Sequence, residues 1–164
     1  MVKIGIIGPE SSGKTTLARY LAKRYKGTYV PEYARTYVEQ LMANGRTDEW
    51  TNVITYDDVC TIARYQIDQL QSLASGDSSV AFFDTELIVT KVWFDWVWGR
   101  VPEWLNEAIL RYLMDVYLLV YPDLPWVPDP ARSNGSDAIR MELFERYERE
   151  IQALDVPYYI IKHC

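Results

Sequence analysis

A short run of small, hydroxyl-bearing and basic residues near the start of the chain has the composition of a phosphate-binding loop. It reads GPESSGKTT, from Gly8 to Thr16, and fits the spacing G-x-x-x-x-G-K-[ST]. Gly8 and Gly13 allow backbone angles that a side chain would obstruct, so successive N–H groups can bind phosphate oxygens. Lys14 adds a positive charge for the β- and γ-phosphates, and Thr15 offers a hydroxyl to Mg²⁺. The pattern predicts a site for a nucleoside polyphosphate.

The loop is expected to bind the phosphates along its whole length. The candidate phosphate-binding residues within it are Gly8, Glu10, Ser11, Ser12, Gly13, Lys14, Thr15 and Thr16. ATP is favoured over GTP, because the chain has no N-K-x-D sequence for reading guanine and Asp84 is not followed by x-x-Gly. The structural alternative is an ordinary glycine-rich turn that caps a helix.

Asp84 is the first of two candidate acids, and it ends the apolar run VAFFD. In an open parallel sheet the carboxyl ends of the strands face the ligand crevice. Asp84 is therefore predicted to hold Mg²⁺ opposite Thr15, and it is one candidate for the catalytic base. Its structural alternative is to cap a helix that begins near Glu86.

Glu32 is the second candidate acid and lies in the segment VPEYAR. A carboxylate here can orient or deprotonate an attacking hydroxyl, or it can simply favour the start of a helix. Arg35, one turn later, can pair with Glu32 or contact substrate, and a surface ion pair fits equally well. The sequence leaves open whether Asp84 or Glu32 is the base.

Residues 123–140 form a proline-rich stretch that loosens into SNGS and contains Arg132 and Arg140. This pattern predicts a lid that brings arginines over the γ-phosphate and excludes water, with a plain surface loop as the alternative. Trp126, between prolines of this stretch, can stack on a flat ring. Gln66 is a candidate amide reader of substrate or a solvated polar residue. The tryptophans between residues 93 and 98 lie in an apolar helical pattern that favours packing.

Strands alternate with helices along the chain, which predicts a parallel sheet covered on both faces. Apolar runs predict strands at residues 2–7, 28–30, 80–84, 116–121 and 158–162. Helical spacing of apolar residues predicts helices from residue 14 to about residue 25, and at 32–43, 56–74, 86–98, 102–114 and 139–154. The expected fold is a single domain over residues 1–164, an α/β P-loop NTPase three-layer sandwich with a five-stranded parallel sheet and a lid loop.

Composition narrows the range of partners. The chain has 164 residues and a net charge of −6, which argues against general binding to nucleic acid or anionic membranes. No apolar stretch approaches the about 20 residues of a membrane span. Cys60 and Cys164 lack metal-site spacing, so a reducing cytoplasm is expected. The only histidine, His163, lies next to the end of the chain.

Several segments together resemble the nicotinamide riboside kinase domain of NadR-type proteins. They are GPESSGKTTL, VPEYAR, DDVCTIARYQ, FFDTE and PWVPDPARSNGS, and they span nearly the whole chain in order. The resemblance implies transfer of the γ-phosphoryl group of ATP, with Mg²⁺, to the 5′-hydroxyl of nicotinamide riboside. It assigns the lid arginines to Arg132 and Arg140 and the nicotinamide-stacking tryptophan to Trp126. Its support for Glu32 and Gln66 in substrate binding is weaker.

The chain departs from that family in ways that limit the expected activity. NadR-type proteins usually carry an adenylyltransferase domain with an H-x-G-H type motif, which is absent here. We therefore expect formation of the mononucleotide but not of complete NAD. The chain also ends just after the fifth predicted strand, where such domains often continue. A kinase for another nucleoside or nucleotide, or a regulatory P-loop ATPase, are the alternative interpretations, and oligomeric state is left open.

Overall fold

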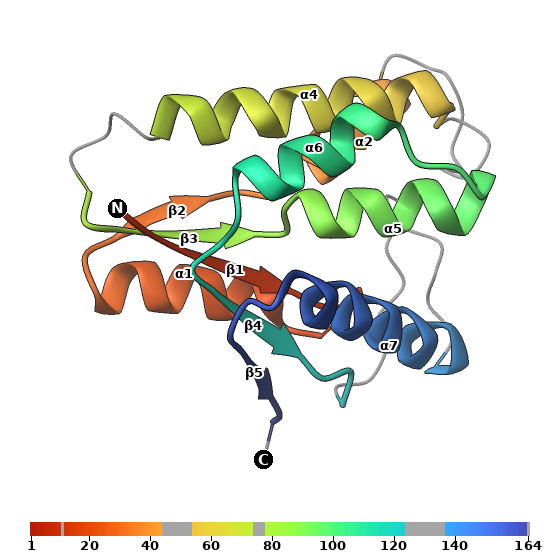
Figure 1. Cartoon of the computed structure of the whole chain (residues 1–164). Coiled ribbons are helices and arrows are strands. Elements are labelled where there is room, and N and C mark those ends of the chain that lie inside the picture. Colours follow the sequence, from red (N-terminus) through yellow and green to blue (C-terminus); the bar gives the residue numbers. More distant parts are fainter. Residues whose placement is uncertain (11, 44–53, 74–77, 124–136, 164) are drawn as a thin grey trace.

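The computed structural model describes residues 1–10, 12–43, 54–73, 78–123 and 137–163, and everything below refers to these (Figure 1). The chain alternates strands and helices as the sequence predicted. In chain order the elements are β1 (Val2–Ile7), α1 (Lys14–Arg24), β2 (Thr28–Val30), α2 (Tyr33–Ala43), α4 (Tyr56–Leu73), β3 (Val80–Asp84), α5 (Leu87–Trp98), α6 (Glu103–Arg111), β4 (Val116–Val120), α7 (Asp137–Leu154) and β5 (Tyr158–Ile161).

The five strands form one parallel sheet in the order β2-β3-β1-β4-β5. β1 lies at the centre, where its Ile6 is paired with Asp84 of β3 and with Leu118 of β4. The expected five-stranded parallel sheet is thus confirmed. Because the strands are parallel, their carboxyl ends share one edge of the sheet, and the loops that follow β1 and β3 lie next to each other.

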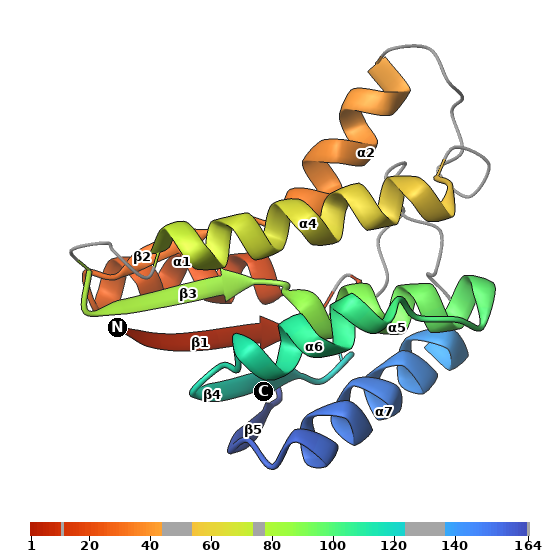
Figure 2. The same ribbon diagram turned by 45° about the horizontal axis from the view of Figure 1, so that its top comes forward.

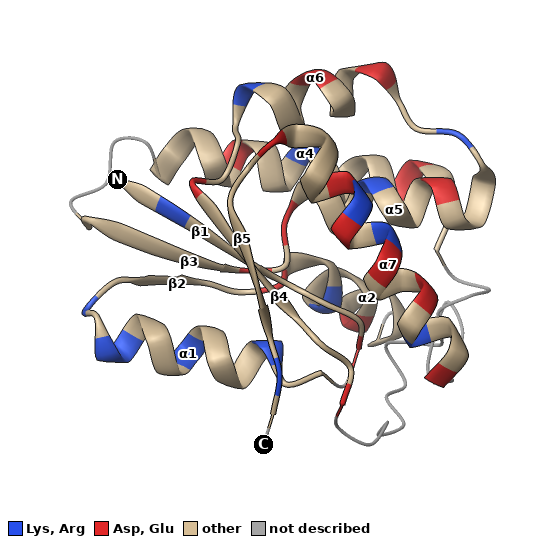
Figure 3. Ribbon diagram, turned by 60° about the horizontal axis from the view of Figure 1, so that its bottom comes forward, with Lys and Arg blue, Asp and Glu red and all other residues tan. Residues whose placement is uncertain are grey.

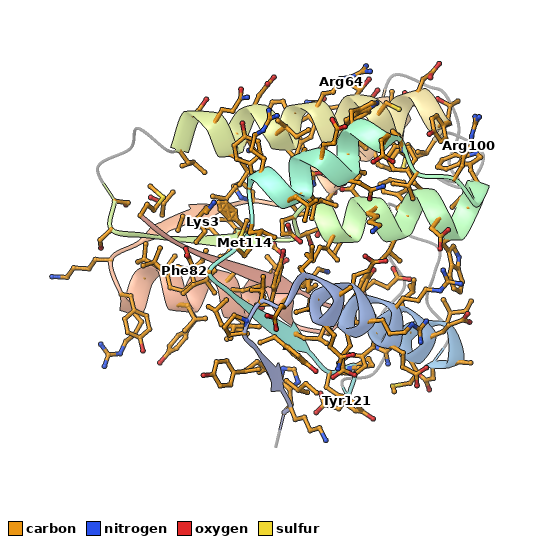
Figure 4. The ribbon with its side chains drawn as sticks, in the orientation of Figure 1. Lys3, Arg64, Phe82, Arg100, Met114 and Tyr121 are labelled. Carbon is orange, nitrogen blue, oxygen red and sulfur yellow. The ribbon has the colours of Figure 1, made fainter. Side chains whose placement is uncertain are left out.

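Helices cover both faces of the sheet, because successive side chains of a strand point to opposite sides. Ile6 belongs to a small cluster with Ala18 and Ala22 of α1, whereas Ile7 belongs to the large core beneath the other helices. In Figure 1, α1 lies below the sheet and α4, α5 and α6 lie above it. Figure 4 shows Phe82 of β3 on the α1 side, consistent with its place in the small cluster. The three-layer arrangement is confirmed.

Local signals fix the ends of several helices. Thr55 and Asp58 form a reciprocal cap at the start of α4, with Thr55 N donating to Asp58 Oδ2 at 2.9 Å and Asp58 N donating to Thr55 Oγ1 at 3.1 Å. Gly99, with φ 65°, ends α5 in the left-handed conformation. α6 ends at Arg111, before the expected residue 114, because Tyr112 leaves the helical conformation.

Helices α5 and α7 lie next to each other across the end of the sheet (Figure 2). Two ion pairs join them: Lys91 to Glu150 at 2.8 Å and Arg146 to Asp95 at 2.9 Å. In Figure 3 the charged residues lie mostly on helices, whereas the strands carry few. None of the helices in the described ranges is long and apolar enough to cross a bilayer.

Candidate functional site

The phosphate-binding loop connects the central strand β1 to α1 and is held closely by its surroundings. A Cβ added at Gly8 would come within 2.8 Å of the Val120 carbonyl oxygen, so only glycine fits there. Gly13 has φ 87°, in the left-handed region that favours glycine, and α1 begins at the next residue. Ser12 is fully buried, and its hydroxyl donates to the Pro9 carbonyl at 2.7 Å. The loop geometry therefore explains both glycines of the motif.

Thr15 and Asp84, the two candidate magnesium ligands from the sequence, are in contact at the edge of the sheet. The Thr15 hydroxyl donates to Asp84 Oδ2 at 2.6 Å, and the Tyr29 hydroxyl donates to the same oxygen at 3.1 Å. Burial, together with the Asp84 charge, raises the pKa of Tyr29. Helix α5 is capped by Glu86, whose carboxylate accepts from Ile88 N at 2.9 Å. Asp84 is consequently not the helix cap.

The second carboxyl oxygen of Asp84 is buried and has no hydrogen-bond partner among the described residues. An oxygen in this position beside a threonine hydroxyl suits a hard cation such as Mg²⁺, which keeps several waters and takes few protein ligands. No cluster of three or more metal-binding side chains occurs within the described ranges. Thr15 and Asp84 thus fit a cation that is held mainly by phosphates.

Lys14 and Glu32 form the second close pair of the site. Their Nζ and Oε2 atoms are 3.9 Å apart, and both side chains are at least nine-tenths buried. Glu32 immediately precedes α2, at the carboxyl end of β2, and Lys14 begins α1. The structure therefore places the candidate base Glu32 next to the lysine of the phosphate-binding loop.

Arg140 lies against the phosphate-binding loop from α7. Its side chain is 3% exposed, with Nη1 donating to the Glu10 carbonyl at 3.5 Å and Nη2 bonded to Asp137 Oδ1 at 3.0 Å. The loop thus has an arginine beside it in this conformation. Arg132, Trp126 and Ser11 lie outside the described residues, so their predicted roles stay predictions.

Gln66 and Arg35 occupy different environments. Gln66 is buried, and its Oε1 accepts from the Thr90 hydroxyl at 2.7 Å, so it is not a solvated residue. Arg35 is exposed and pairs with Glu39, four residues later, at 3.1 Å. This is a surface ion pair, although Arg35 also borders the main cavity described next.

One cavity connects the phosphate-binding loop to an aromatic wall. Its lining includes Gly8, Glu10, Lys14 and Glu32 around the phosphate-binding loop and Trp93, Trp96 and Tyr147 on α5 and α7. The Arg146 guanidinium lies over the Trp96 ring, 5.0 Å from its centre. A smaller cavity next to it is bordered by Gln66 and Glu86, and Thr85 borders both cavities.

Sequence reasoning missed the tryptophans in the main cavity and the buried acid beside it. Trp93 and Trp96 are three residues apart on the helix that follows Asp84, and this placement after a crevice strand was the available signal. Glu86 is 5% exposed, and burial raises its pKa to about 7. Burial also raises the pKa of Tyr117, whose side chain hydrogen-bonds with Glu86. No pattern in the sequence predicts that Glu86 and Tyr117 lie together.

A family model described as an AAA domain matches residues 3–164. The chain belongs to this AAA domain family. The match covers the phosphate-binding loop, the sheet and α7, so every element of the site lies within this AAA domain.

NadR proteins are among the relatives of this AAA domain. It is 31% identical over 139 residues to the trifunctional NAD biosynthesis/regulator protein NadR of Escherichia coli K12, covering 85% of this chain and 33% of that protein. The chain thus spans about a third of the length of this relative. The resemblance to NadR-type proteins is confirmed.

Solved NadR structures share the fold. NadR in complex with NR has a TM-score of 0.72 and 23% identity, and the match covers 97% of this chain and 43% of that chain. NadR in complex with NAD and AMP-PNP has a TM-score of 0.73 and 24% identity, with coverage of 99% and 44%. The P-loop α/β architecture of this AAA domain is therefore established.

Proposed function

We propose that this protein is a kinase that transfers the γ-phosphoryl group of ATP to the 5′-hydroxyl of nicotinamide riboside. The observation that carries the proposal is one cavity that is lined both by Lys14 and the carboxylate of Glu32 and by tryptophans of α5. A phosphoryl donor and a flat acceptor can occupy such a cavity together.

The part of the lining around the phosphate-binding loop supports ATP as the donor. Lys14, the backbone of the loop and the start of α1 all favour polyphosphate, and the buried Arg140 adds a second cation close by. The NadR protein of the same fold was solved with AMP-PNP, an ATP analogue. Magnesium, bound with the nucleotide and held by Thr15 and Asp84, would neutralise charge on the β- and γ-phosphates.

The aromatic lining of the cavity supports a positively charged ring as part of the acceptor. Nicotinamide riboside carries a permanent cation in its pyridine ring, and Trp93 is among the residues that line the cavity. Aromatic faces attract such cations. A neutral nucleoside of similar size would not gain this interaction. One solved NadR protein contains NR.

Of the two candidate bases, we assign the proton transfer to Glu32. Asp84 already accepts hydrogen bonds from Thr15 and Tyr29 on the magnesium side, whereas Glu32 borders the acceptor cavity beside Lys14. In the proposed reaction the acceptor oxygen bonds to the γ-phosphorus as the bond to the β–γ bridging oxygen breaks. The hydroxyl proton passes to Glu32, and ADP leaves.

The test is ADP release from Mg²⁺–ATP with a panel of acceptors. The panel contains nicotinamide riboside, nicotinic acid riboside, adenosine, cytidine and thymidine, together with a reaction that lacks acceptor. Reduced nicotinamide riboside, which has lost the ring charge, is the matched control. We expect turnover to depend on acceptor and to fall when the ring is reduced.

Two outcomes of the panel would overturn the proposal. Preference for a neutral nucleoside would make the protein a kinase of another specificity. Slow release that is the same with and without acceptor would instead indicate a regulatory ATPase.

A further inference from the structure

Thr85, directly after β3, has a backbone conformation that its residue type disfavours. Its φ is 73°, in the left-handed region, where a β-branched side chain is an outlier. The other non-glycine residues with positive φ in the described ranges are Lys26 and Asp155, which are exposed and follow helices. Thr85 instead is 7% exposed and lies between Asp84 and Glu86.

The hydroxyl of Thr85 is buried and has no hydrogen-bond partner among the described residues. Its backbone is well satisfied, because Thr85 N donates to the Ile6 carbonyl at 2.9 Å and continues the β1–β3 ladder. A hydroxyl that is buried without a partner loses its hydrogen bonds to water and gains none from the protein, which costs free energy. Within the described part of the chain, the fold therefore makes no use of the hydroxyl of Thr85.

A purely structural role would favour a different residue at this position. Glycine would adopt the left-handed conformation without steric cost and would bury no hydroxyl. Strain that the surrounding structure maintains tends to occur at ligand sites, where it fixes a group in place. Both unfavourable properties of Thr85 are accounted for if a ligand accepts or donates a hydrogen bond there.

The surroundings of Thr85 indicate which part of the ligand it meets. Thr85 borders the main cavity together with Lys14 and Glu32, and it borders the smaller cavity together with Gln66. The main cavity is also lined by Trp93, so Thr85 borders the same space as Lys14 and the proposed binding site of the ring. In an acceptor nucleoside, the sugar connects the reacting 5′-oxygen to the ring and would occupy this shared space.

We propose that Thr85 is a substrate-binding residue whose hydroxyl hydrogen-bonds to a sugar hydroxyl of the acceptor nucleoside. The bond orients the sugar so that its 5′-oxygen faces the γ-phosphate beside Glu32. This inference rests on the proposed kinase function and adds a contact that neither the phosphate-binding motif nor the candidate acids supply. The rigid backbone of Thr85 presents the hydroxyl without a further loss of chain entropy.

Three proteins test the role of Thr85: the wild type, Thr85→Val and Thr85→Ser. Valine keeps the branched shape and removes the hydroxyl, whereas serine keeps the hydroxyl. We expect Thr85→Val to lower kcat/KM for the nucleoside about tenfold, the usual effect of one lost hydrogen bond, with the KM for ATP unchanged. Thr85→Ser should stay within about threefold of the wild type. The melting temperature of Thr85→Val should equal or exceed that of the wild type.

The possible results separate this inference from the proposed function. If the wild type phosphorylates a nucleoside and Thr85→Val does so equally well, the substrate contact is wrong and the kinase assignment stands. A lower melting temperature in Thr85→Val, with losses shared equally by ATP and nucleoside, would show a structural hydroxyl and would also overturn the inference. Absence of acceptor-dependent turnover in the wild type would reject both proposals.

Discussion

The hydroxyl of Thr15 and the carboxylate of Asp84 are joined by a hydrogen bond of 2.6 Å, although 69 positions separate them in the chain. One residue belongs to the first turn of α1 and the other ends β3. They meet because β1 and β3 are neighbours in a parallel sheet, which brings both carboxyl ends to one edge. In the proposed function, the cation that accompanies ATP binds at this contact.

Replacing Asp84 by asparagine should weaken the response to magnesium. The amide keeps the shape and the hydrogen bond from Thr15 but removes the negative charge that a cation requires. We expect the magnesium concentration at half-maximal activity to rise about 10- to 100-fold, the usual effect of losing a supporting group at a metal site. A magnesium titration of ADP release measures this, with exposed Asp57→Asn as the control. An unchanged midpoint in Asp84→Asn would contradict the assignment.

Replacing Lys14 by alanine should abolish most phosphoryl transfer while leaving the fold intact. In the proposed reaction the ammonium group stabilises the negative charge that develops on the phosphates, so we expect kcat to fall about 10²- to 10³-fold. Lys23→Ala, an exposed lysine in the same helix, is the control. Circular dichroism establishes folding, and ADP release measures activity. Turnover like that of the wild type in folded Lys14→Ala would reject the site.

The buried carboxyl of Glu86 should make the protein less stable as the pH rises. Its pKa is raised from 4.5 to about 7 in the folded protein, so the folded state retains a proton that the unfolded chain releases. The stabilising contribution is complete below pH 4.5 and is lost as the pH rises to about 7. Across this pH range, the free energy of unfolding falls by an amount on the order of 3 kcal/mol.

Urea unfolding at a series of pH values tests this dependence on Glu86. In Glu86→Gln the amide cannot ionise, so the decline in unfolding free energy across the window should be largely absent. Exposed Glu103→Gln serves as the control and should decline as the wild type does. Parallel curves for Glu86→Gln and the wild type would show that the carboxyl does not titrate in this range.

Replacing Trp93 by leucine should weaken the charged nucleoside more than ATP. Loss of a cation–ring contact predicts a 3- to 30-fold higher KM for nicotinamide riboside, and the effect should be smaller for its reduced, uncharged form. The matched control is Trp98→Leu. Trp98 lies on the same helix but packs edge-on against Tyr56, with the two ring centres 5.5 Å apart. Equal losses for charged and uncharged acceptors in Trp93→Leu would argue against ring recognition.

The fold could be predicted well from the sequence because its signals are local. The apolar run ending at Asp84 and the glycine motif before Lys14 each mark the end of a strand, and their order specifies a parallel sheet. The sequence does not mark the end of every element. The shorter α6 depends on Tyr112 leaving the helical conformation, and no glycine or proline marks that point.

Residues of the candidate site could be predicted from the sequence only where a short local pattern contains them. Thr15 and Lys14 follow from the spacing of the motif, and Asp84 follows from its place at the end of an apolar run. The structure brings Thr15 against Asp84. Trp93 could not be identified from the sequence, because a tryptophan in an apolar helix is equally consistent with packing in the core. Thr85 could not be identified because its unusual backbone angle is not visible in the sequence. Which residues border a cavity depends on how α5 packs against α7, and that is a tertiary property.

The central position of β1 has a consequence for how the protein tolerates local damage. β1 pairs on both sides with strands that are themselves inside the sheet, β3 and β4. The edge strands of the sheet are the short strands β2 and β5. Fraying begins where contacts are fewest, so transient opening at either margin leaves the strand that carries the glycine motif fully paired. The loop after β1, where we propose that the triphosphate binds, is therefore little affected by fluctuations at the edges of the sheet.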